Sequence, residues 1–117
     1  MELRHVRYFV AAVEEGSIQA AANRLNVAQP ALSRQIRDLE HELGSMLLER
    51  HARGVRLTAA GMEFHKDALA ILQAVQDAVF RARQLRMQKD RRVTFGIVRT
   101  ASKYRFPHDA TESFARE

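Results

Sequence analysis

Apolar residues in the first part of the chain recur at steps of three and four, which is the spacing of one face of an α-helix. The first apolar face ends near Gly16, where a helix can stop, and consists of Leu3, Val6, Phe9, Val10 and Val13. Ser17 can cap a second helix. The buried face of this second helix consists of Ile18, Ala21, Ala22 and Leu25. Two helices are therefore predicted before Asn26, and Asn26 and Val27 are expected to form a tight turn that leads into the next helix.

A third helix is predicted from about Gln29 to Leu43, ending at Gly44, because glycine tolerates the positive φ of a helix C-cap. Its apolar face consists of Leu32, Ile36, Leu39 and Leu43. A second face carries Pro30, Ser33, Arg34 and Arg37. Pro30 fits the first turn, where its missing N–H has no intrahelical partner. One side of this helix should pack in a core, and the other should present polar groups.

The period changes after Gly44. Two short apolar segments, Met46–Glu49 and Val55–Thr58, flank a glycine-containing turn over His51–Gly54. This pattern predicts a β-hairpin with arginines on it or at its tip.

A long fourth helix is predicted from about Ala59 to Lys89, with Thr58 as its cap. At about 1.5 Å per residue it would span roughly 45 Å, longer than so small a domain needs. Its apolar stripe consists of Phe64, Ala68, Ile71, Val75, Ala78, Ala82 and Leu85. We expect this stripe to pair with a second copy of the chain, and the alternative is that it folds back onto its own domain.

The pattern therefore divides the chain into three parts, 1–58, 59–89 and 90–117. The last part opens with the strand-like run "RRVTFGIV" and ends with "FPHDATESFARE", which could start a helix. We interpret it as a hinge followed by the truncated start of another domain.

The chain has a positive net charge, but its first half is nearly neutral. The 117 residues carry 19 Lys and Arg against 14 Asp and Glu, a net charge of +5, which favours a polyanionic partner. Positions 1–58, however, carry eight arginines against seven acids. If this part binds DNA, a few placed arginines must do so, because it lacks a strong overall positive field.

Several classes of site are not expected. The chain has no cysteine, so a disulfide framework and a thiolate metal site are both excluded. The five histidines lack metal-ligand spacing, and "HELGS" has Ser45 where a zinc-protease motif needs its second histidine. No nucleophile elbow, phosphate-binding glycine loop or pair of catalytic carboxylates is found. We therefore expect no catalytic residues, no metal and no cofactor, and the chain is not expected to be an enzyme.

The segment "AANRLNVAQPALSRQIRDLEHELG", followed by "LLERHARGVRLTAAG", resembles the N-terminal winged helix-turn-helix of LysR-type bacterial transcriptional regulators. The resemblance runs from Leu3 to about Lys89. It implies a mainly α fold with a two-stranded β wing and a long C-terminal dimerisation helix. The opening "MELRHVRYFVAAVEEGSI" and the triplet "AQP" are similar to members that control aromatic-acid catabolism. Ala28 stands where many members have a serine that can cap the third helix.

In a helix-turn-helix, the second helix of the motif enters the major groove of DNA with its first residues at the base edges. Gln29 can pair with adenine, Arg34 can form a bidentate contact with guanine, and Ser33 can bond to a base or a phosphate. Pro30 would contact a thymine methyl, and Arg37 is better placed for a phosphate. The alternative is a solvated surface, with Arg37 paired to a neighbouring carboxylate.

The resemblance also assigns roles to the wing. It implies that Arg53, at the wing tip, enters the adjacent minor groove. Arg50 is expected either to touch the DNA backbone or to tie the wing to the domain.

The expected partners follow from these roles. They are double-stranded DNA with an inverted-repeat site, a second copy of the chain, a tetramer in a longer protein, and RNA polymerase. With no apolar run of about 18 residues and a charged N-terminus, the expected location is the cytoplasm, at the nucleoid, with no membrane partner. Two alternatives stay open: a protein-interaction module that uses the long helix, and a nucleoid-type binder without sequence preference.

Overall fold

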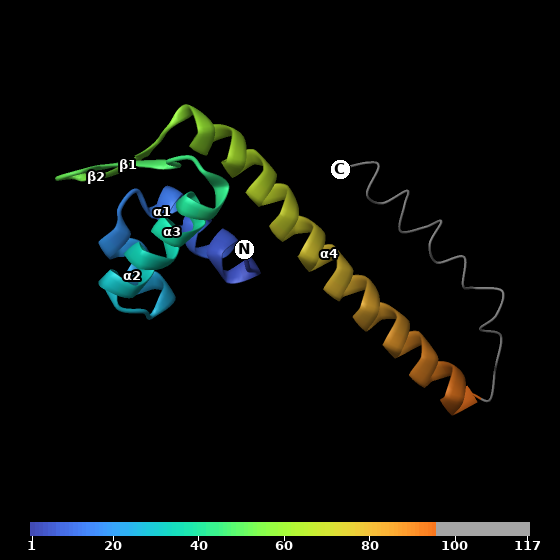
Figure 1. The fold of residues 1–117 in the computed structure, drawn as a ribbon. Helices are drawn as coiled ribbons and strands as arrows, with labels where there is room; N and C mark the ends of the chain where they lie inside the picture. The colour runs from blue at the N-terminus through green and yellow to red at the C-terminus, as the bar shows by residue number, and fades with distance from the viewer. Residues whose placement is uncertain (96–117) are drawn as a thin grey trace. The chain divides into compact units, whose positions relative to one another are not determined.

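The structure is a computed structural model that describes residues 1–95, with side chains placed for residues 1–89. Figure 1 shows its elements in chain order. They are α1 (Leu3–Glu15), α2 (Ile18–Leu25), α3 (Gln29–Leu43), β1 (Leu48–His51), β2 (Gly54–Leu57) and α4 (Ala59–Phe95). The chain divides into two compact units at Leu72, within α4. The first unit contains the whole winged helix-turn-helix.

The core of the first unit lies between α1, α2 and α3 and receives side chains from the hairpin and α4. Its largest fully buried side chains are those of Phe9, Leu32, Ile36, Leu39, Leu47, Leu48 and Val6. Ala21 and Ala22 are buried on α2, where small side chains let the neighbouring helices approach closely. The predicted apolar face of α3 is confirmed except at its end, because Leu43 precedes the C-cap and is 39% exposed.

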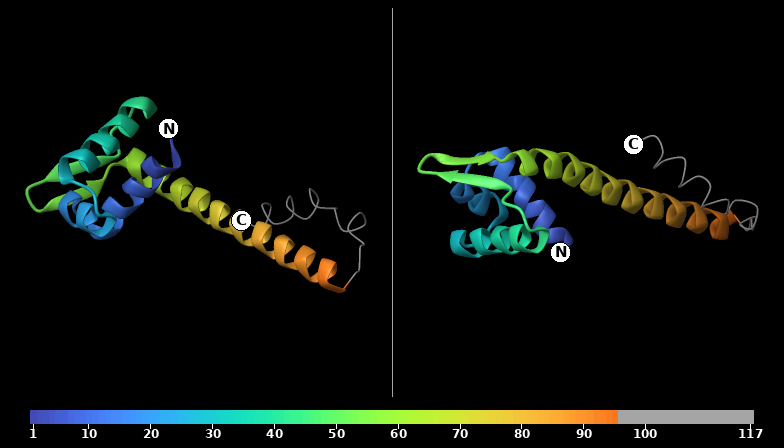
Figure 2. Two further views of the ribbon diagram at one scale, coloured as in Figure 1. Left: turned by 90° about the horizontal axis from the view of Figure 1, so that it is seen from below. Right: turned by 45° about the horizontal axis from the view of Figure 1, so that its top comes forward.

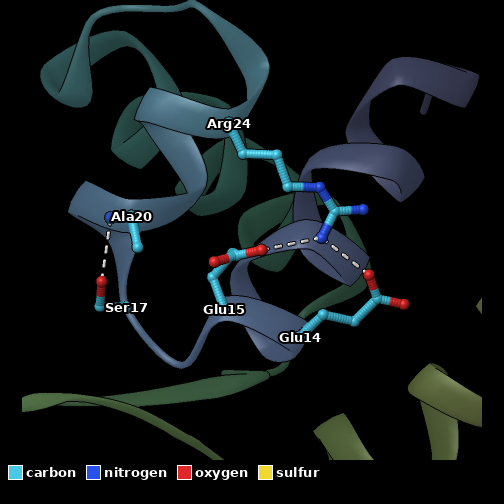
Figure 3. Close-up of polar contacts among 5 residues, drawn as sticks. All are labelled: Glu14, Glu15, Ser17, Ala20 and Arg24. Carbon is cyan, nitrogen blue, oxygen red and sulfur yellow. Dashed lines mark hydrogen bonds and ion pairs between the residues drawn. The ribbon is translucent and has the colours of Figure 1, made fainter.

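The helix ends fall where local residue chemistry sets them. Gly16 ends α1 and Gly44 ends α3, each in the left-handed conformation that glycine adopts without a steric cost. The Ser17 side chain caps α2 by accepting a hydrogen bond of 2.9 Å from the Ala20 N–H (Figure 3). The predicted ends of the first three helices are confirmed. Ala28, at the N-cap of α3, makes no side-chain cap bond.

The turn between α1 and α2 is also held by charge. Arg24 on α2 donates to Glu14 at 2.8 Å and to Glu15 at 3.2 Å (Figure 3). The hydrogen bond to Glu14 raises the pKa of Arg24. These pairs are solvent-exposed, so they orient the turn more than they stabilise it.

The hairpin is confirmed, but its first strand begins at Leu48 and not at Met46. Leu48 lies opposite Leu57, and the chain reverses at Ala52 and Arg53. The backbone just before β1 is bound to α3, because the Leu47 and Leu48 N–H groups donate to the Glu40 carboxylate. This contact from outside the hairpin fixes where the strand starts.

The hairpin touches the turn between α1 and α2 through the backbone. The Val55 N–H donates to the Gly16 carbonyl at 3.0 Å. Gly54 has a φ of +149°, and a Cβ atom added to it would lie 2.2 Å from the same carbonyl oxygen. Only glycine allows this close approach, so Gly54 fixes the tip of the hairpin against the helices.

The fourth helix begins as predicted, with the Thr58 hydroxyl accepting a bond of 2.9 Å from the Gly61 N–H. The helix does not end at Lys89 as predicted but continues to Phe95. The first five residues of the strand-like run "RRVTFGIV" are therefore helical, and the prediction of a strand is wrong for them. No glycine or proline lies between Gly61 and Gly96, so nothing in the sequence interrupts the helix earlier. The remainder of "RRVTFGIV" and the run "FPHDATESFARE" lie outside the described residues.

Candidate nucleic-acid interface

A polar cleft of about 520 Å³ lies between α3 and the hairpin. In both views of Figure 2 the start of α3 and the hairpin tip point to the same end of the domain. The cleft brings together five of the seven predicted DNA-binding residues, namely Gln29, Ser33, Arg37, Arg50 and Arg53. Two elements far apart along the chain therefore present polar and cationic groups to one concave surface.

The start of α3 presents Gln29, Pro30 and Arg34 to solvent, and Arg37 is exposed one turn further along. Within the described part of the chain, neither Arg34 nor Arg37 forms an ion pair or a side-chain hydrogen bond. The expected alternative partners of Arg37, the carboxylates near it on α3, do not engage it. These two guanidinium groups are thus available to bind a phosphate or a base edge.

Ser33 differs from its prediction. It is only 7% exposed, and its Oγ accepts a hydrogen bond of 2.5 Å from Arg50 Nη1. It follows Leu32 on α3 and so faces the hairpin more than the solvent. The prediction that Ser33 is presented on the polar face with Arg34 is therefore wrong, although Ser33 is among the residues that line the cleft.

Arg50 is half-buried and connects the two sides of the cleft. Beside its bond to Ser33, its Nη2 lies 3.9 Å from Glu40 Oε1. Burial lowers the pKa of Arg50, the positive charge of Arg37 lowers it further, and Glu40 opposes this shift. Of the two expected roles for Arg50, the contacts favour the one that ties the wing to the domain.

The tip of the hairpin carries Arg53, which is exposed and lies in the two-residue turn. His51 and Arg56 lie beside it, and Arg56 Nε donates to His51 Nε2 at 3.1 Å. Among the described residues Arg53 has no intramolecular ion pair. Its charge therefore remains available at the rim of the cleft.

The sequence pattern missed three residues that shape this site. Gln19 and His51 line the cleft, and Glu40 lies beneath it with only 4% of its surface exposed. Glu40 could have been noticed, because it lies four residues after Ile36 and so falls beside the apolar face of α3. Gln19 and His51 had no such signal, since their place depends on how the hairpin packs.

The predicted dimerisation stripe is divided between two environments. Ala68 is fully buried in the core of its own unit, and Phe64 packs edge-on against Phe9 with ring centroids 5.4 Å apart. These two positions follow the fold-back alternative. Further along α4, Ile71, Val75 and Leu85 are half-buried, and Ala78 and Ala82 are exposed. Among residues 59–89 of α4, the large exposed apolar residues are Met62, Leu69, Val79, Phe80 and Met87.

Residues 1–89 contain no group of three or more His, Cys, Asp or Glu side chains that could hold a metal ion. None of the helices there has the length and apolar content needed to cross a membrane.

Comparison with known proteins agrees with this geometry. The family model described as "Bacterial regulatory helix-turn-helix protein, lysR family" matches residues 3–62. The Hca operon transcriptional activator HcaR of Escherichia coli is 52% identical over 101 residues, which cover 86% of this chain and 34% of HcaR. The chain thus spans about a third of the length of this curated relative.

Solved structures match as well. The complex of the BenM DNA-binding domain with catB site 1 DNA is 50% identical, with a TM-score of 0.70 over 73% of this chain and 96% of that one. The complex of the CbnR DNA-binding domain with DNA is 47% identical, with a TM-score of 0.70 over 73% of this chain and 98% of that one. In both structures a domain of this fold is bound to DNA.

Proposed function

Because this chain belongs to the LysR family of bacterial regulatory helix-turn-helix proteins and carries a LysR-type DNA-binding domain, we propose that α3 and the hairpin read one duplex from two sides. The observation that carries this proposal is the cleft that Gln29 and Arg53 line together. A cleft with cationic groups on both walls suits a phosphate backbone that runs between two grooves.

In this proposal α3 supplies the base readers. Gln29 and Arg34 are exposed at the start of the helix, where a helix-turn-helix meets base edges. A glutamine amide matches adenine N6 and N7, and a guanidinium matches guanine O6 and N7. Pro30 contacts a thymine methyl, and Arg37 binds a phosphate.

The wing supplies Arg53 to the adjacent minor groove, where narrow A·T-rich segments concentrate negative potential. Arg50, held by Ser33, ties the wing to the domain and makes no base contact. Since positions 1–58 carry a net charge close to zero, the affinity of one domain for DNA is low.

A second copy of the chain would raise this affinity. The exposed apolar residues of α4 beyond Leu72, namely Val79, Phe80 and Met87, can pair with the same helix of another copy. Two-fold symmetry then requires an inverted-repeat site. The proposal has further parts. We propose that a longer protein forms a tetramer and contacts RNA polymerase, and that it lies at the bacterial nucleoid in the cytoplasm. We also propose that it has no enzymatic activity and controls aromatic-acid catabolism.

The function is tested by selecting duplexes from a random library with the 117-residue chain in the presence of excess non-specific DNA. The expected result is an interrupted inverted repeat whose binding survives the competitor. Recovery without sequence preference, with a steep loss of binding as salt rises, would instead assign the chain to non-specific DNA binders.

Pairing through α4 is tested by replacing Phe80 with aspartate. Phe80 is 62% exposed within one chain, so its loss leaves the fold intact and removes only an external contact. The expected result is a monomer that binds a half-site weakly, measured by light scattering and by titration with whole and half sites. Gln84→Asp adds the same charge at an exposed polar position of α4 and should leave the mass unchanged. A Phe80→Asp variant with the wild-type mass would contradict the proposed interface.

A further inference from the structure

A buried carboxylate on α3 links this helix to the hairpin. Glu40 is 4% exposed, and its Oε2 accepts hydrogen bonds from the backbone N–H groups of Leu47 at 2.8 Å and Leu48 at 3.1 Å. An ionised carboxylate in a core is costly unless it is well paired. Here both hydrogen bonds come from the backbone at the start of β1. The Glu40 carboxylate therefore binds the hairpin and not another side chain of α3.

The other oxygen of the same carboxylate faces the wing arginine. Glu40 Oε1 has no hydrogen-bond partner and lies 3.9 Å from Arg50 Nη2, which also lacks one. Arg50 Nη1 is meanwhile bonded to Ser33 on α3. A single cluster of Glu40, Arg50 and Ser33 therefore connects α3 to β1 at both the start and the middle of the strand.

Nothing else joins α3 to the hairpin by polar contacts within the described residues. Of the other polar contacts of the hairpin, the Val55 N–H donates to the Gly16 carbonyl between α1 and α2, and the Thr58 N–H donates to the Leu47 carbonyl at the base of the hairpin itself. The cluster around Glu40 is thus the polar link that positions the first strand relative to α3. It acts together with the apolar packing of Leu47 and Leu48 in the core and with the contact of the hairpin tip to Gly16. The position of the hairpin relative to α3 determines how far Arg53 lies from Gln29 across the cleft.

We propose that Glu40 is a positioning residue for DNA recognition, which through Leu47, Leu48 and Arg50 fixes the distance between the wing arginine and the base-reading end of α3. The inference rests on the proposed function, because it needs Arg53 to contact DNA. Glu40 itself touches no DNA. It acts on affinity only through Arg53, and this distinguishes it from a residue that merely stabilises the fold.

The test is a double-mutant cycle of Glu40→Gln and Arg53→Ala in the 117-residue chain, titrated with a duplex that the wild-type chain selects. Glutamine keeps an oxygen acceptor for the backbone N–H groups but removes the charge that faces Arg50. Glu40→Gln is expected to weaken binding about tenfold in the wild-type background and by no more than about twofold in the Arg53→Ala background. Equal losses in both backgrounds would overturn the inference.

Two further variants make the result unambiguous. Glu42→Gln removes an exposed carboxylate from the same helix and should leave binding unchanged. Ser33→Ala removes the α3 anchor of Arg50 while keeping the bonds from Glu40 to Leu47 and Leu48. It should show the same dependence on Arg53 even if the Glu40 variant fails to fold, and additive losses for Ser33→Ala would also overturn the inference.

Hydroxyl-radical and methylation footprints provide a second readout. Glu40→Gln should lose minor-groove protection at the wing while guanine N7 protection by α3 remains. If Arg53→Ala alone leaves the affinity unchanged, the wing contact of the proposed function fails and the inference fails with it. If Arg53→Ala weakens binding but does not couple to Glu40, the proposed function stands and only the inference fails.

Discussion

Replacing Arg34 with alanine is expected to weaken specific DNA binding by about 1–3 kcal/mol, which corresponds to a loss of about 5- to 150-fold in affinity. Arg34 is exposed on α3 and has no intramolecular ion pair among the described residues. Its removal therefore leaves the fold intact. The loss arises because alanine cannot form the bidentate hydrogen bonds that a guanidinium donates to guanine O6 and N7.

The measurement is an anisotropy titration at fixed salt with the selected duplex and with duplexes changed at single base pairs. Arg7→Ala is the matched control, because Arg7 is an exposed arginine on α1 and its loss changes the net charge equally. Arg34→Ala should relax the preference at one base pair, whereas Arg7→Ala should leave the preference unchanged. If both variants lose the same small amount of affinity and keep the base preference, Arg34 contributes only to the sequence-independent electrostatic attraction to DNA.

Replacing Gly54 with alanine is expected to lower the free energy of unfolding by about 2–5 kcal/mol. Two effects combine at this position. The φ of +149° is strained for any residue with a side chain, and the new Cβ would lie 2.2 Å from the Gly16 carbonyl oxygen. The clash is with backbone, which has no rotamer by which to move away, so the hairpin tip must shift.

Gly44→Ala separates these effects. Gly44 has a φ of +72° but nothing within 4 Å of an added Cβ, so only backbone strain of about 1–2 kcal/mol is expected. Urea unfolding followed by circular dichroism measures both variants. Losses of equal size would show that the contact between the hairpin and the turn after α1 contributes nothing. Because the clash displaces the wing, Gly54→Ala should also weaken DNA binding more than Gly44→Ala does.

The parts of the fold that sequence predicted well are those that local chemistry decides. Gly16, Ser17 and Gly44 set helix ends through their own backbone preferences and side-chain bonds, and these ends agree with the structure. The predicted start of β1 was wrong because hydrogen bonds from Leu47 and Leu48 to Glu40 on α3 set where the strand begins. The apolar pattern of the strand itself carries no information about this contact with another element.

The candidate site shows the same division. The apolar face of α3 predicts which of its residues are exposed, and Gln29, Pro30, Arg34 and Arg37 are exposed as expected. Ser33 lies at the border of that face. Its burial depends on Arg50 reaching across from the hairpin, and an interaction between two elements cannot be obtained from the period of one of them.

The separation of the two faces of α3 has a consequence for how binding specificity can diverge. The exposed residues at its start make no contribution to the core, and exchanges at such surface positions usually change stability by no more than about 0.5 kcal/mol. Under the proposed function, new operator preferences can therefore arise by substitution at Gln29, Pro30 or Arg34 without compensating changes elsewhere. Ser33, one residue from Arg34, lacks this freedom because it holds Arg50. Under the same proposal, exchange of the exposed positions alone is the simplest way to redirect this domain to a different DNA sequence.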